Sequence, residues 1–274
     1  VVADSEDGQV AYGIEEAMEE RGFTVNETMK GFYASETCAP YYRKASFFGN
    51  EVPGHSLVPA FSASYSEADT YTVGEAPAEV YTDDVLESAK DTTAVVVLSR
   101  DSSEASDYST NMKDPNGDSF DTPMSISAYE KEMIQLAKKN SNGKVIVLIN
   151  SDVPMEIQEL KDDPDIGAIL WTGLPGMNGF LGVCDVLSGA VNPSGHISDT
   201  YATCSVSAPA MTNFGLYTYT NASNAESGAE LTEANKGDWY VVETEGIYIG
   251  YKYYETRYED TVLNQGNADT TEGS

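Results

Sequence analysis

Acidic side chains are concentrated in the stretch that follows the first apolar run of the chain, residues 92–98. After Arg100, the acidic residues Asp101, Glu104 and Asp107 come first, and three further aspartates follow before position 122. A carboxyl group in this place can serve as a general acid if burial raises its pKa toward neutrality. The alternative is a set of solvated loop acids, because the chain holds 45 Asp and Glu residues and such residues are mostly exposed.

Three short runs of β-branched and aliphatic residues predict strands buried on both faces: residues 92–98, 144–149 and 167–171. A helical pattern follows each run. The first helix is expected to open at a capping box formed by Ser127 and Glu130. The second is expected to begin at Pro154, and the third to span residues 177–187.

This alternation of strands and helices is typical of a parallel sheet with right-handed crossovers. We therefore predict an α/β fold with a mostly parallel sheet between helices and irregular flanking segments. Such a sheet gathers its strand-to-helix loops at one edge, where ligands bind: residues 99–125, 150–153 and 172–176. The first of these connections is too long for a structural turn, and long ordered loops are commonly functional.

The flanking segments give weaker patterns. A helix is expected within residues 10–21, whereas residues 40–85 and 205–238 lack firm periodicity. Residues 245–256 could form an aromatic strand or a short helix, and the tail at 261–274 is expected to fray.

The charge of the chain argues against two classes of partner. Fifteen Lys and Arg against 45 Asp and Glu give a net charge of −30, which repels nucleic acid and anionic membrane surfaces. An aromatic content of 10% indicates a folded body under an acidic coat rather than a disordered chain. No apolar run reaches the ~18 residues of a membrane span, and the first residues lack a secretion-signal pattern. We expect a soluble protein, and the sequence does not indicate its cellular compartment.

No cofactor or metal is predicted. His55 and His196 are too few for a histidine metal site, and the three cysteines lack the close spacing of a zinc site. The glycines of residues 173–179 have neither dinucleotide-binding spacing nor the lysine of a phosphate loop.

Several segments together resemble the C-terminal α/β-sandwich domain of glycoside hydrolase family 3, the β-glucosidase type. The run Asp-Val-Leu-Ser-Gly-Ala-Val-Asn-Pro-Ser-Gly at residues 185–195 is the most specific of them. Other segments keep the order and spacing of the family: residues 94–105, 144–150, 168–176 and 245–256. The best-matched part covers residues 90–256, and we assign residues 1–260 to this domain.

The resemblance implies a sheet of about six mostly parallel strands, packed against a barrel domain. Family members hydrolyse O-glycosyl bonds with retention: an Asp on the barrel attacks the sugar, and a Glu protonates the leaving oxygen. In many β-glucosidases that Glu lies in a Ser-Gly-Glu-Gly motif, which corresponds here to residues 102–105, so the resemblance implies Glu104 as acid/base. Ser103 and Ala105 replace the glycines, which makes Asp107 the fallback. Arg100 and Asp101 become substrate-binding candidates.

The sequence contains no barrel pattern and no Ser-Asp-Trp nucleophile motif. Retention requires two carboxyl groups about 5 Å apart, and the nucleophilic one is missing here. The expected partner is therefore a barrel domain of the same protein that carries it. The expected substrate of the complete enzyme is an oligosaccharide or a glucoside. We predict that this chain alone is inactive and belongs to a bacterial-type β-glucosidase-like hydrolase. The alternative is a non-catalytic module that binds carbohydrate or a partner protein.

Overall fold

The computed structural model describes residues 11–41, 74–100, 124–212 and 245–258. Outside these ranges it describes isolated positions and seven short strands that pair in small sheets: β1 (Ala45–Phe47), β2 (Asn50–Val52), β3 (Tyr71–Thr72), β5 (Met112–Lys113), β6 (Ser119–Phe120), β9 (Tyr217–Thr218) and β10 (Trp239–Tyr240).

A parallel sheet in the order β4-β7-β8 forms the centre of the described structure. Its strands are β4 (Val95–Arg100), β7 (Val145–Ser151) and β8 (Ile166–Trp171). Val147 pairs with Val96 on one side and with Ile169 on the other. The three runs therefore form neighbouring parallel strands, which confirms the α/β prediction. The expected burial of the third strand on both faces was wrong, because β8 lies at the edge of the described sheet and its residues are half-buried or exposed.

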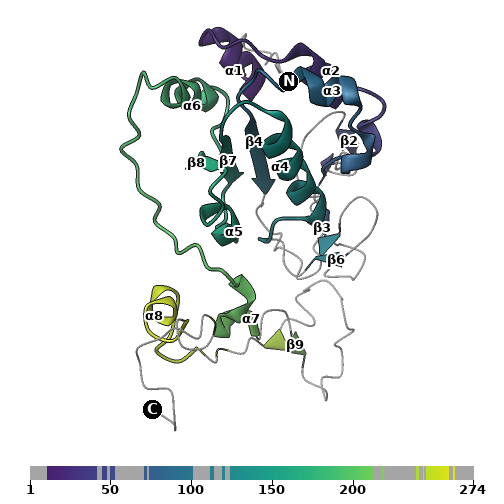
Figure 1. Cartoon of the computed structure of the whole chain (residues 1–274). Coiled ribbons are helices and arrows are strands. Elements are labelled where there is room, and N and C mark those ends of the chain that lie inside the picture. Colours follow the sequence, from purple (N-terminus) through teal and green to yellow (C-terminus); the bar gives the residue numbers. More distant parts are fainter. Residues whose placement is uncertain are drawn as a thin grey trace.

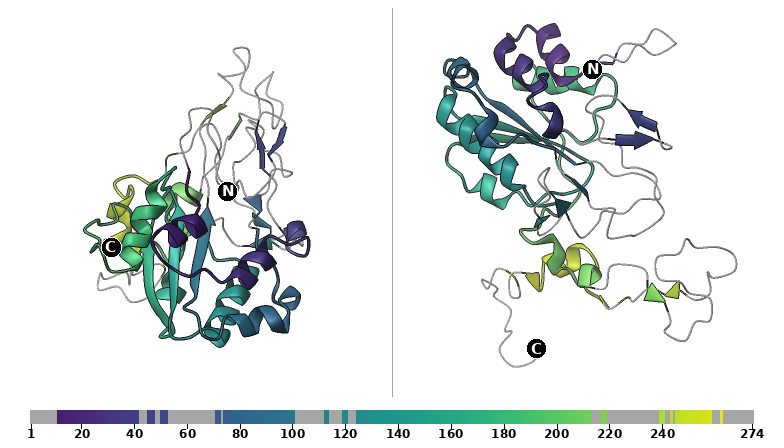
Figure 2. Two further views of the ribbon diagram at one scale, coloured as in Figure 1. Left: turned by 90° about the horizontal axis from the view of Figure 1, so that it is seen from above. Right: turned by 90° about the vertical axis from the view of Figure 1, so that its right-hand side faces the viewer.

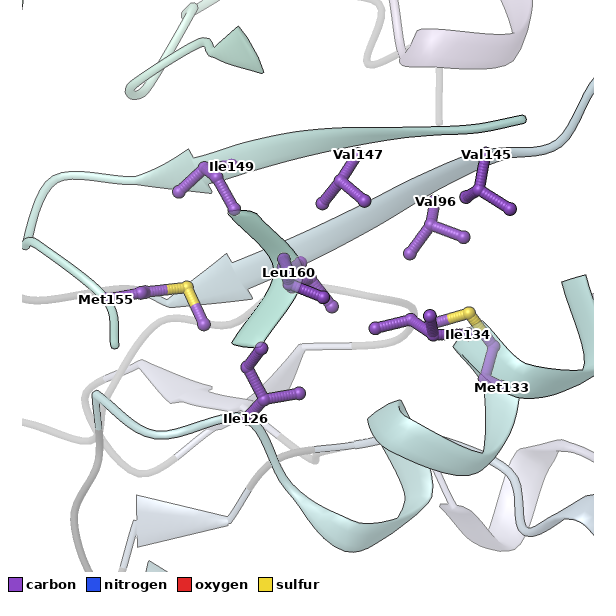
Figure 3. Packing of buried hydrophobic residues seen from close by; sticks show 10 residues of the cluster. Val96, Ile126, Met133, Ile134, Val145, Val147, Ile149, Met155 and Leu160 are labelled. Atoms are coloured by element: carbon purple, nitrogen blue, oxygen red, sulfur yellow. The ribbon is translucent and has the colours of Figure 1, made fainter. Parts of the chain in front are cut away.

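The main core lies between one face of this sheet and two helices, α4 (Ala128–Asn140) and α5 (Gln158–Lys161). Side chains from β4 and β7 alternate in and out of this core, as strand geometry requires. Figure 3 shows the strand side chains facing those from the helices and their connections: Val96, Ile126, Met133, Ile134, Val145, Val147, Ile149, Met155 and Leu160. Alternation along β4 also turns Arg100 toward this helical face, two residues after the buried Leu98.

The capping box predicted at the start of α4 is present. The Ser127 hydroxyl accepts a hydrogen bond from the Glu130 N–H at 3.1 Å, and the Glu130 carboxylate accepts one from the Ser127 N–H at 2.7 Å. The predicted start of the next helix at Pro154 was wrong, because α5 begins at Gln158. The Glu156 N–H donates instead to the carbonyl of Met124 at 2.8 Å, which holds this stretch against the chain entering α4.

The amino-terminal segment adds α1 (Ile14–Glu20), α2 (Glu27–Tyr33), η1 (Ala39–Tyr41), η2 (Ala78–Val80) and α3 (Asp83–Ser88). The helix expected within residues 10–21 is α1, which contacts α6 (Gly179–Leu187). Arg21 of this segment forms an ion pair of 2.7 Å with Asp185 of α6. The right-hand view of Figure 2 shows α4 and α5 on one side of the sheet and α1 and α6 on the other.

The carboxyl-terminal part contains η3 (Ser205–Ser207), α7 (Pro209–Thr212) and α8 (Tyr251–Tyr254). Figure 1 shows the chain running in an extended path from α6 to α7. Residues 245–256 thus form a short helix at α8 rather than a strand. Of the tail at 261–274 only Val262 lies among the described positions, so the predicted fraying stays a prediction.

Candidate functional site

The carboxyl ends of the three parallel strands bring polar groups to one edge of the sheet. Ser99 and Arg100 end β4, Asn150 and Ser151 end β7, and Trp171 ends β8. In a parallel sheet this edge is where a ligand site forms. We call these residues, with the side chains that bond to them, the carboxyl edge.

Arg100 is the most constrained side chain of the carboxyl edge. Its guanidinium donates two parallel hydrogen bonds to the Glu130 carboxylate, Nη1 to Oε1 at 2.7 Å and Nη2 to Oε2 at 2.8 Å. Nη1 also donates to the Ser99 carbonyl at 2.8 Å, and Nη2 to the Ser125 carbonyl at 2.7 Å. The exposed fractions of the two side chains are 0% for Arg100 and 4% for Glu130. Because the two charges are opposite and bonded to each other, their attraction offsets the cost of removing them from water.

Asn150 joins all three strand ends. Its Nδ2 donates to the Gly173 carbonyl at 2.6 Å, and its Oδ1 accepts from the Ser99 hydroxyl at 3.3 Å. Gly173 has a φ of 60°, a conformation that favours glycine. The loop after β8 is thereby fixed to the ends of β7 and β4.

Trp171 contributes an anchored aromatic ring to the same edge. Its indole Nε1 donates to the Ser151 carbonyl at 2.7 Å. A Cβ atom at Gly173 would lie 3.3 Å from Cζ2 of the ring, so the turn packs closely on the indole. The residue stays 43% exposed, which leaves part of the ring open for contact.

The structure describes some of the site residues predicted from the sequence, and others lie outside the described ranges. Arg100 is among the described residues, and its guanidinium bonds to Glu130 and to the carbonyls of Ser99 and Ser125. Substrate binding by Arg100 stays a prediction. Asp101, Glu104 and Asp107 lie outside the described residues, as does His55. His196 is described and exposed. Across the described part of the chain, no group of three His, Cys, Asp or Glu side chains could hold a metal ion.

A second polar cluster escaped the sequence prediction. The Glu75 carboxylate accepts hydrogen bonds from the Ala76 N–H at 2.7 Å and the Tyr81 hydroxyl at 3.1 Å, and the Tyr33 and Tyr81 hydroxyls lie 2.6 Å apart. Burial, together with charge repulsion from Glu130, raises the pKa of Glu75 to about 7. Burial also raises the pKa of both tyrosines. We call Glu75, Tyr33 and Tyr81 the tyrosine cluster.

The sequence signal for these interactions is weak. Tyr33 and Tyr81 are 48 residues apart, and the segment before Glu75 has no firm periodicity. Glu130 was predicted as half of a capping box, but nothing in the local pattern indicates its pairing with Arg100 30 residues away.

The fold and the carboxyl edge together define an α/β domain that presents polar loops at one edge of a parallel sheet. The family model described as "Glycosyl hydrolase family 3 C-terminal domain" matches residues 7–251. The chain belongs to this family.

Two similar curated relatives match about half of the chain, and a third matches less than a third of it. A probable β-glucosidase A from Aspergillus clavatus is 33% identical over 136 residues, which are 50% of this chain and 14% of the relative. β-Glucosidase A from Butyrivibrio fibrisolvens is 31% identical over 131 residues, 48% of this chain and 13% of the relative. β-D-Xylosidase 1 from Arabidopsis thaliana is 30% identical over 80 residues, 29% of this chain and 10% of the relative.

A solved structure shares the fold over nearly the whole chain. β-Glucosidase 3B from Thermotoga neapolitana, solved in complex with glucose, aligns with a TM-score of 0.55 and 21% identity. The alignment covers 92% of this chain and 30% of that one. This chain therefore spans less than a third of the length of that structure and a smaller share of the curated relatives.

Within the described residues, no helix combines the length and the apolar character needed to cross a bilayer.

Proposed function

We propose that this chain supplies the leaving-group side of a retaining β-glucosidase-like active site, completed by a barrel domain of the same protein. The family match over residues 7–251 supports the enzyme class, and the β-glucosidase relatives support the substrate class. Relatives come from fungi, a plant and bacteria, so a bacterial type is a further part of the proposal.

One observation carries the assignment of the site. Arg100 is the last residue of β4, at the edge where all three parallel strands end, and Glu104 follows four residues later in the sequence. We assign Glu104 as the acid/base residue that protonates the leaving oxygen and later activates water. Asp107 is the fallback for this role, and Asp101 is a candidate substrate contact.

The proposed mechanism divides two carboxyl groups between two domains. The barrel Asp would attack the anomeric carbon and form a glycosyl-enzyme, while Glu104 gives its proton to the departing oxygen. Glu104 would then take a proton from the water that hydrolyses the intermediate. Because the two groups must lie about 5 Å apart, the chain by itself should not turn over a glucoside.

The test compares the isolated chain with the polypeptide that joins it to its barrel domain. The joined polypeptide should hydrolyse phenyl β-glucoside and the isolated chain should not. Glu104→Gln in the joined polypeptide should lower kcat/KM for this substrate by about 10²–10⁴-fold, the usual contribution of general acid catalysis. Asp107→Asn is the matched control and should have little effect.

Three results would contradict the proposal. Glucosidase activity of the isolated chain that depends on Glu104 would remove the need for a barrel. A large loss in Asp107→Asn with none in Glu104→Gln would move the acid/base role to the fallback residue. Binding of cello-oligosaccharides without any hydrolysis by the joined polypeptide would favour a non-catalytic module.

A further inference from the structure

One guanidinium holds both ends of the connection between β4 and α4. Arg100 donates to the Ser99 carbonyl, immediately before the connection, and to the Ser125 carbonyl near its other end, at 2.8 and 2.7 Å. Chain segments that lie 25 residues apart are thus bonded to one planar group. These bonds tie the end of β4 to the stretch that enters α4.

Glu130 fixes the guanidinium in turn. Both of its carboxylate oxygens accept from Arg100, and one of them also accepts from the Ser127 N–H at the start of α4. The Ser127 hydroxyl accepts from the Glu130 N–H. Hydrogen bonds therefore hold both the backbone and the carboxylate of Glu130, which fixes its side-chain conformation. The bidentate pair has a single planar geometry, which a lysine cannot reproduce.

Stability alone does not account for this arrangement. A capping box needs only Ser127 and Glu130, and a buried ion pair is often no more stable than apolar residues of similar volume. Core residues such as Leu98 fill the same face of β4 with apolar side chains. What the ion pair adds is a fixed orientation of the strand end.

We propose that Arg100 and Glu130 are positioning residues that direct the chain beyond β4 so that Glu104 meets the leaving oxygen of the glycoside. This inference rests on the proposed function. Four residues of extended chain span at most about 14 Å, so the strand end limits where Glu104 can be placed. Proton transfer requires heavy atoms within hydrogen-bond distance, and a displacement of 1 Å can lower a rate by about 10²-fold.

The experiment uses the polypeptide that joins this chain to its barrel domain. kcat/KM is measured for phenyl β-glucoside, whose leaving oxygen needs a proton, and for 2,4-dinitrophenyl β-glucoside, whose leaving group departs without one. Glu130→Gln keeps the capping-box residue type but removes the charge, and Arg100→Lys keeps the charge but loses the planar fork. Both variants should lose about 10²-fold on the phenyl substrate and less than about threefold on the dinitrophenyl substrate.

The ratio of the two kcat/KM values does not depend on how much of the enzyme is folded, so a merely structural role would leave it unchanged. Asp163→Asn is the matched control: it breaks the 2.6 Å pair with Lys138, which lies near the other end of α4, and should not change the ratio. An unchanged ratio in both Glu130→Gln and Arg100→Lys overturns the positioning role. If Glu104→Gln also leaves the phenyl substrate unaffected, the proposed function itself has failed.

Discussion

The carboxyl edge and the tyrosine cluster each withdraw a carboxyl group from water, and they treat it differently. At the carboxyl edge, Glu130 faces a guanidinium through two charge-assisted hydrogen bonds. In the tyrosine cluster, Glu75 receives bonds from neutral donors, the Ala76 N–H and the Tyr81 hydroxyl. Among the described residues, no cation forms an ion pair with Glu75.

The consequence at Glu75 is a raised pKa. Desolvation dominates at Glu75 and raises its pKa to about 7, although the bonds from Ala76, Tyr81 and Tyr33 act in the opposite direction. Neutral donors stabilise a carboxylate less than a cation does. The comparison teaches that a carboxyl group withdrawn from water can be handled in two ways: Glu130 is paired with a fixed positive charge, whereas the pKa of Glu75 rises to about 7.

The largest expected effect comes from breaking the pair at the carboxyl edge. Arg100→Met leaves the Glu130 charge buried without its partner, which should lower the free energy of unfolding by about 3–5 kcal/mol. Urea unfolding of the chain at neutral pH measures this change. Combining it with Glu130→Gln should recover most of the loss, because no unpaired charge then remains. A loss below about 1 kcal/mol for Arg100→Met alone would show that water reaches this pair.

The tyrosine cluster should make stability depend on pH. The folded-state pKa of Glu75 is about 7, above its ordinary value of 4.5. Its contribution to stability is therefore fully present below the ordinary value and is lost as the pH rises through about 7. Glu75→Gln mimics the protonated form and should remove this loss, making the variant more stable than the parent by about 3 kcal/mol at pH 8 but not at pH 4.

Urea unfolding across this pH range checks the prediction. Glu79→Gln is the matched control, because Glu79 is exposed on the neighbouring η2 and should not alter the pH profile. Parallel profiles for the parent and Glu75→Gln would remove the contrast between the two clusters.

A smaller effect separates the two roles of Glu130. Ser127→Ala removes the hydroxyl that accepts from the Glu130 N–H but leaves both bonds to Arg100 in place. The expected loss is about 1 kcal/mol, the usual value for an N-cap residue, again measured by urea unfolding. A loss as large as that of Arg100→Met would mean that the cap and the ion pair cannot be separated.

Local patterns in the sequence predicted the elements better than the contacts between them. The three apolar runs became β4, β7 and β8, and the Ser127 capping box opened α4, because both signals depend on residues close in sequence. Pro154 was misleading because the helix begins only at Gln158, after Ile157 in a non-helical conformation, and the Glu156 N–H bonds to the Met124 carbonyl of another segment. A residue type that suits a first turn does not decide where the helix begins, because tertiary contacts override local propensity.

The candidate site was predictable only in its location. A parallel sheet directs its loops to one edge whatever their sequence, so the carboxyl edge followed from the strand order. The bidentate contact between Arg100 and Glu130 depends on how far α4 lies from β4, and the tyrosine cluster depends on how the end of α2 packs against the residues that flank η2. A local pattern of residue types predicts neither of these tertiary arrangements.

The Arg100–Glu130 pair also constrains how this domain can evolve. If either partner is replaced alone, a buried charge is stranded, whereas replacing both with neutral residues avoids that penalty. Codon changes arise one at a time, so a lineage that abandons the pair must first pass through an unstable protein. Descendants should therefore either retain both residues or differ at both, and a genome that preserves only one should carry a compensating charge nearby.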